Sequence, residues 1–199
     1  AMGLIGGTVS ELNTKTDIVV LGAFTTDKIV GIYSIASLIF EGLALVPQVL
    51  RNIANPLIAR AVVVGDSRAL SDALRQTRLA ATLLTALGAV AVWLLYHPFV
   101  EIALANPDFL EALPALLILM AGLVICAPWM PLDMLFSQAN RPFAQSLFKG
   151  GVFTVNLALN IALVPFFGLT GAAIATACAQ IVGVLLIKVM ARRLLSLNV

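Results

Sequence analysis

The chain has 199 residues, of which 61% are hydrophobic and 11% are charged, and its mean hydropathy is +1.04. This composition leaves too little polar surface to cover a soluble globular protein of this length, so it predicts an integral membrane protein. The formal net charge is +2, and the basic residues are spread along the chain rather than clustered, which gives no support to nucleic-acid binding. The apolar runs are continuous, which favours spanning helices over a transmembrane barrel.

The predicted fold class is an all-α integral membrane protein, a six-transmembrane-helix bundle formed by a single domain. A span needs about 20 mostly apolar residues to cross a hydrocarbon core of about 30 Å. The connection 57–78 carries several arginines and predicts a short amphipathic helix on the cytoplasmic membrane surface. The expected spans are residues 4–25, 31–55, 79–96, 113–137, 143–167 and 171–193.

Three prolines shape these predictions. Pro56 is expected to end the second span, and Pro128 and Pro131 predict a kink in the fourth. Asp133 follows that kink, and the sequence places it either in the inner half of the fourth span or at its cytoplasmic end.

The orientation follows from the basic residues. All of them except Lys15 and Lys28 lie on one side of the predicted topology, which the positive-inside rule makes the cytoplasmic side. An even number of spans then puts both termini in the cytoplasm. We therefore expect a multi-pass protein of the cell inner (plasma) membrane.

Three of the predicted spans carry polar side chains along one face, read at 100° per residue. In the first span, Asn13 and Asp17 share a face, and Lys15 lies beside them at an i,i+4 spacing from Glu11 that suits an ion pair. Ionisable groups inside a membrane mark transport paths more often than packing, whereas amides also join helices by hydrogen bonds. The stripes of the second and fifth spans include Glu41, Gln48, Lys149, Asn156 and Asn160.

The sixth span shows a different pattern, because small residues recur every four positions. Such a face suits close helix packing. Gln180 is the one member of this face whose role stays open. The small residues are Gly171, Ala175, Ala179 and Gly183.

The sequence carries no pattern typical of catalysis. It has neither a glycine-rich phosphate loop nor a Cys/His cluster with metal-ligand spacing, and its single histidine, His97, has no nucleophile nearby in sequence. We expect no enzymatic activity, no cofactor and no bound catalytic metal.

Four segments, in this order and spacing, resemble the C-terminal half of polysaccharide-export flippases. These proteins form the Wzx-like, O-antigen-transporter branch of the multidrug/oligosaccharidyl-lipid/polysaccharide exporter superfamily, and the resemblance runs from about Thr8 to the end of the chain. The segments are TKTDIVVLGAFTTDKIVGIYSIA, NPLIARAVVVGDSRALSDALRQTRLA, SQANRP and NIALVPFFGLTGAAIATACAQIV.

The resemblance implies that the chain is one half of a pseudo-symmetric transporter. Members of this family have two six-helix halves around a central cavity, so the partner is expected to be an N-terminal six-helix half or a second copy. They move undecaprenyl-pyrophosphate-linked oligosaccharide across the inner membrane by alternating access, driven by a coupling cation or proton. Asp17 matches the acidic residue in the first helix of the family's C-terminal half.

These implications assign a role to each candidate residue. Lys15, Arg51 and Lys149 are expected to attract the pyrophosphate, and Asp17 and Glu41 to bind the coupling ion. The amides that hydrogen-bond the sugar are then Asn13, Gln48, Asn156 and Asn160. Two alternatives remain open: an ion-coupled multidrug or cation antiporter of the related extrusion branch, expected to have an aromatic-lined acidic pocket, and a non-transporting scaffold whose stripes pack dry.

Overall fold

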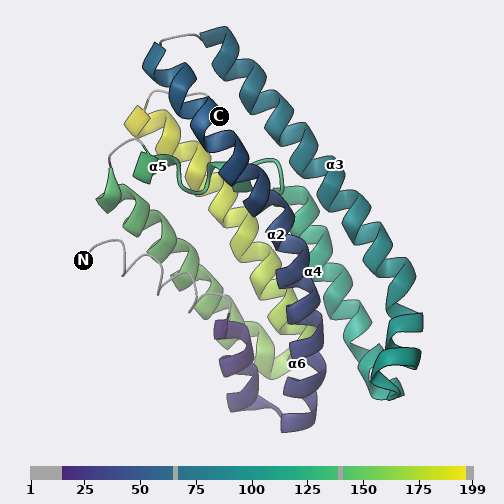
Figure 1. The fold of residues 1–199 in the computed structure, drawn as a ribbon. Coiled ribbons are helices and arrows are strands. Elements are labelled where there is room, and N and C mark those ends of the chain that lie inside the picture. Colours follow the sequence, from purple (N-terminus) through teal and green to yellow (C-terminus); the bar gives the residue numbers. More distant parts are fainter. Residues whose placement is uncertain (1–14, 65–66, 139–140, 196–199) are drawn as a thin grey trace.

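The computed structural model describes residues 15–64, 67–138 and 141–195, which are almost entirely helical (Figure 1). Residues 15–24 form a short helix ahead of the labelled elements. The labelled elements are α2 (Asp27–Val64), α3 (Ser67–Phe99), the π-helix η1 (Val100–Leu104), the 3₁₀ helix η2 (Pro107–Ala112), α4 (Leu113–Cys126), the 3₁₀ helix η3 (Met130–Leu132), α5 (Leu135–Gln138) and α6 (Pro142–Leu195).

The structure confirms a helical membrane protein but does not support the predicted count of six spans. Among the described residues, four helices are long and apolar enough to cross a membrane. Much of the predicted first span, 4–25, lies outside the described residues, and the predicted fifth and sixth spans both fall within α6. The four helices are Asp27–Ile58, Arg68–Leu104, Pro107–Cys126 and Pro142–Arg193.

α6 folds back on itself at a single residue. Gly168 has φ 52° and ψ −130°, a left-handed conformation that breaks the helix and that glycine adopts without a steric penalty. The two arms then pack side by side, because Gly151 on the first arm lies against Leu186 on the second and Gly183 lies against Val152. Figure 1 shows the green and yellow arms meeting at the lower end of the bundle. One glycine thus makes the turn between the predicted fifth and sixth spans.

The predicted amphipathic connection 57–78 is wrong as a separate element. α2 continues through Pro56 to Val64, and α3 begins at Ser67, so the connection is the end of one helix and the start of the next. A proline removes one backbone hydrogen bond, which a long helix in a membrane protein tolerates when neighbouring helices support it. Pro56 therefore leaves α2 unbroken.

The predicted kink in the fourth span is a full interruption. α4 ends at Cys126, and the chain then runs through a turn and the one-turn helix η3 before α5. Pro128 and Pro131 cannot donate backbone hydrogen bonds, which explains why the α-helix stops just before them. This break gives Asp133 its position at the end of η3.

The core of the bundle is formed by α2 and α4 with the second arm of α6. Ala172 and Ala173 are buried in one cluster with Ala115 and Leu119 of α4. The small-residue face predicted for this arm is used for packing, because Ala175 and Ala179 are buried and Gly183 lies against Val152. α3 lies along the edge of the bundle, next to α2, and exposes many large apolar side chains (Figure 1). An outward apolar face of this kind suits contact with lipid.

Candidate functional site: a charged cavity between α2, η3 and α6

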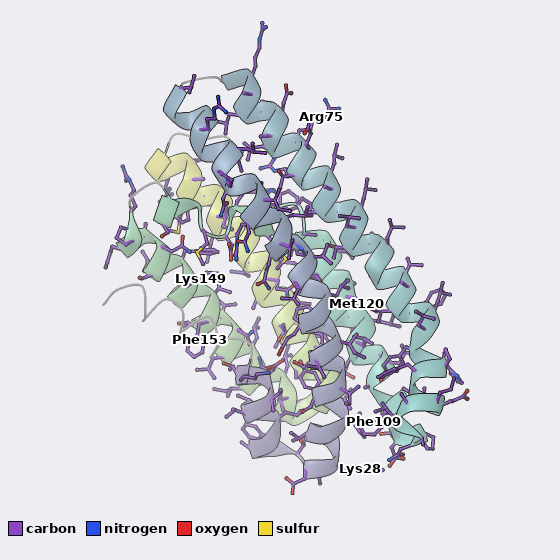
Figure 2. The ribbon with its side chains drawn as sticks, in the orientation of Figure 1. Lys28, Arg75, Phe109, Met120, Lys149 and Phe153 are labelled. Atoms are coloured by element: carbon purple, nitrogen blue, oxygen red, sulfur yellow. The ribbon has the colours of Figure 1, made fainter. Side chains whose placement is uncertain are left out.

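A cavity of about 290 Å³ lies where α2, the interrupted end of α4 and both arms of α6 meet. Three of the residues predicted from sequence line it: Gln48 and Arg51 on α2, and Lys149 on α6. Figure 2 labels Lys149 on the first arm of α6, on the side of the bundle opposite α3. The cavity is therefore built from segments far apart in sequence.

Arg51 and Lys149 both bind the same carboxylate. Arg51 Nη1 lies 2.6 Å from Asp133 Oδ1, and Lys149 Nζ lies 3.0 Å from Asp133 Oδ2. The three side chains are only 15–23% exposed, so water screens their charges poorly. Two cations against one carboxylate leave this cluster with an excess of positive charge facing the cavity.

Backbone contacts hold Asp133 in place. The side chain of Gln145 on α6 donates a hydrogen bond from Nε2 to the Asp133 carbonyl oxygen at 2.7 Å. The amide of Asp133 donates to the Met130 carbonyl oxygen at 3.1 Å and closes the turn of η3. The broken helix is thus fixed against α6 at the point where its carboxylate reaches the two cations.

The rest of the cavity wall is largely apolar. Phe40, Trp129 and Phe148 contribute aromatic rings, and the Trp129 ring also carries Lys188 Nζ 4.1 Å from its centroid, a cation–π contact. Gln180 lines the cavity as well, so the one residue left open on the sixth-span face belongs to the cavity wall. A cavity with a cationic end and aromatic walls suits an amphipathic anion.

Asp17 lies in a second polar position that does not line the cavity. Its side chain is 4% exposed, and its Oδ2 accepts a 2.6 Å hydrogen bond from the hydroxyl of Tyr33, which is fully buried. Asp17 Oδ1 also accepts from the Ile18 amide at 3.0 Å. The first predicted helix therefore places its acid inside the protein, against α2.

Lys15 pairs with Glu41 at 3.0 Å. Its predicted partner Glu11 lies outside the described residues, as does Asn13. The pair is partly exposed, at 58% for Lys15 and 30% for Glu41, and Ser37 donates a long hydrogen bond of 3.4 Å to the same carboxylate. Neither Lys15 nor Glu41 lines the cavity.

Asn156 and Asn160 lie on the first arm of α6 and are almost fully buried. The Asn160 Nδ2 group donates to the Asn156 carbonyl oxygen at 3.0 Å and also bonds the Asn156 side-chain oxygen. The Asn160 side-chain oxygen has no hydrogen-bond partner among the described residues. These amides are therefore internal to the bundle and do not line the cavity.

The structure thus divides the predicted site into separate groups. Gln48, Arg51 and Lys149 meet at the cavity, Lys15 joins Glu41, and Asp17 joins Tyr33. Asp133 has no role assigned from the sequence, although in the structure it connects two of the selected cations. The signal in the sequence is an acid two residues after the second of two prolines in an apolar segment, because a broken helix lets its side chain reach neighbouring elements.

No protein-family model, curated protein or solved structure matches this chain. The resemblance to polysaccharide-export flippases therefore stays a prediction, and the residues themselves carry the functional argument.

Proposed function

We propose that this chain is one half of a membrane transporter that flips a pyrophosphate-linked oligosaccharide lipid across the inner membrane by alternating access. The observation that carries the proposal is the cavity in which Arg51 and Lys149 share Asp133. A guanidinium and an ammonium at one end suit a phosphate group, and both are residues that proteins use to bind phosphates. The aromatic and aliphatic walls suit the apolar part of a lipid-linked substrate.

The charge balance favours this function over the antiporter alternative. The cavity has the aromatic walls expected of a drug-binding pocket, but its acid is already paired with two cations. A cationic drug entering it would meet an excess of positive charge, whereas an anion is attracted. The cavity is thus better suited to an anion than to a cation.

The buried pair Asp17–Tyr33 is the place we assign to ion coupling. A carboxylate inside a membrane protein is costly unless it is paired, and here its partner is a neutral hydroxyl. Asp17 therefore favours an additional proton or cation. α2 carries both Tyr33 and Arg51, so this helix links ion binding at Asp17 to the cavity.

Tryptophan fluorescence tests the head-group assignment directly. Of the two tryptophans, Trp129 lines the cavity and Trp93 is exposed on α3, so a Trp93→Phe protein reports on the cavity alone. A short-chain isoprenyl pyrophosphate should change this emission with a saturating titration, and the matching uncharged isoprenol should not. In the double variant R51Q/K149Q the apparent Kd should rise at least about tenfold, because each charge-assisted hydrogen bond contributes about 1.5–3 kcal/mol. Equal titrations for pyrophosphate and alcohol would reject the proposal.

A further inference from the structure

A second basic site lies on α3, away from the cavity. Ser71, Arg75 and Arg78 line a surface hollow of about 390 Å³ together with Leu74 and Leu79. The three polar residues are spaced so that they fall within about 60° of one another around the helix. Figure 2 labels Arg75 on the upper part of α3.

The buried part of the Arg78 side chain lacks a hydrogen-bond acceptor among the described residues. Two of its guanidinium nitrogens, Nε and Nη2, are buried and have no hydrogen-bond partner among the described residues. A buried donor without a partner is costly, and the cost is greater for a charged group. Arg75 is exposed beside it, and the Ser71 hydroxyl adds a further donor. Two arginines and a hydroxyl form the donor set that phosphate oxygens accept from.

An apolar stripe continues from this hollow along the same side of α3. Leu79, Leu83 and Val90 lie on the adjoining face and are 52–60% exposed. At 1.5 Å per residue, the distance from Arg78 to Val90 is about 18 Å, close to the thickness of one leaflet of the hydrocarbon core, which is about 15 Å. A phosphate bound at Arg78 would therefore lie at one end of the apolar stripe, which is about as long as one acyl chain.

We propose that Ser71, Arg75 and Arg78 bind the phosphate of an anionic phospholipid whose acyl chain lies along Leu79, Leu83 and Val90. The site is independent of the proposed transport function, since it lies on the outer helix and shares no residue with the cavity. The arginines make the site prefer an anionic head group, and the apolar stripe makes it prefer a lipid over a free anion.

Native mass spectrometry of the purified protein with limiting lipid tests the site. Phosphatidylglycerol should be retained in preference to phosphatidylcholine, and R75Q/R78Q should bind it about tenfold more weakly or worse, because each basic residue near a membrane surface contributes about 1 kcal/mol to anionic-lipid binding. The matched control is R192Q/R193Q, which removes the same charge from exposed arginines near the end of α6 and should retain the lipid. The single variant R78K keeps the positive charge at this position and should therefore bind more phosphatidylglycerol than R75Q/R78Q does. If the double variant does not fold, R75Q alone replaces it, since Arg75 is exposed.

Three results would overturn this site. One is equal lipid retention by R75Q/R78Q and the control. A second is complete displacement of phosphatidylglycerol by millimolar inorganic phosphate, which would assign the hollow to a free anion. The third is a lipid-free dimer in which cysteines placed at Val90 of two copies are cross-linked to each other, which would assign the α3 face to a second copy of the chain.

Discussion

Arg51 and Asp133 are 82 positions apart in sequence, yet their side chains meet at 2.6 Å. The contact joins α2 to the segment that interrupts the chain after α4, and Lys149 binds the other oxygen of the same carboxylate from α6. One side chain thus connects three elements around the cavity. It also occupies the two cations that we assign to the substrate head group, so an incoming phosphate has to compete with Asp133 for them.

Removing this carboxylate charge should destabilise the protein. Asp133→Asn leaves Arg51 and Lys149 close together without a counter-charge in a poorly solvated place, and we expect a loss of about 1–3 kcal/mol in the free energy of unfolding. The control is Asp108→Asn, which breaks the exposed ion pair with Lys28 and should cost much less, because water screens an exposed pair. Denaturant unfolding in detergent measures both. Equal losses for the two variants would show that the Asp133 cluster contributes no more than a surface pair.

The sequence predicted the membrane class, the helical content and several cavity residues, because these depend on composition and on residues one helix turn apart. Gln48 and Lys149 were selected from polar faces of their own helices, and Arg51 from the family resemblance. The pairing of Asp133 with Arg51 depends on where the broken helix packs, and no local sequence pattern predicts that position. The count of six spans is not supported, because the predicted first span lies largely outside the described residues and the predicted fifth and sixth spans belong to one helix that turns at Gly168.

The hydrogen bond between Tyr33 and Asp17 should contribute to stability. Tyr33→Phe keeps the ring but removes the hydroxyl that bonds Asp17 at 2.6 Å, leaving a buried carboxylate oxygen without this donor. We expect a loss of about 1–3 kcal/mol in the free energy of unfolding. Ser37→Ala removes only a 3.4 Å contact to a partly exposed acid and serves as the control. A Tyr33→Phe protein as stable as Ser37→Ala would contradict the burial of this pair.

Close packing of α4 against α6 predicts opposite effects for two glycine substitutions. A Cβ on Gly122 would lie 2.8 Å from the Ala177 Cβ, whereas a Cβ on Gly150 would meet nothing within 4 Å. Gly122→Ala should therefore lower the free energy of unfolding by about 1–3 kcal/mol. Gly150→Ala should leave it unchanged or raise it by up to about 1 kcal/mol, since alanine favours helix more than glycine does. Thermal unfolding of the two proteins distinguishes these outcomes, and a reversed order would show that the two helices do not approach this closely.

Water access should separate the cavity from the buried amides. In a protein whose native cysteines, Cys126 and Cys178, are replaced by alanine, a cysteine at Gln48 should react with a water-soluble maleimide. A cysteine at Asn156, which is 2% exposed, should react at least about tenfold more slowly, because the opening of buried positions costs free energy. Labelling rates give the comparison directly. An unreactive Gln48 position would favour the scaffold alternative, in which the polar faces pack dry.

We propose that Arg51 and Lys149 bind the head group of an anionic lipid-linked sugar during its transport. The rate of transport tests this proposal most directly. Vesicles carrying the full-length transporter are loaded with lipid-linked oligosaccharide on one leaflet, and its appearance on the other leaflet is followed with an impermeant sugar-modifying probe. We predict that R51Q/K149Q lowers this rate at least about tenfold. Asp17→Asn should abolish its dependence on the ion gradient, because we assign ion coupling to the buried Asp17–Tyr33 pair. Lys28→Gln, which removes an exposed cation at the start of α2, should leave the rate unchanged. Transport by R51Q/K149Q at the rate of the Lys28→Gln protein would contradict the account.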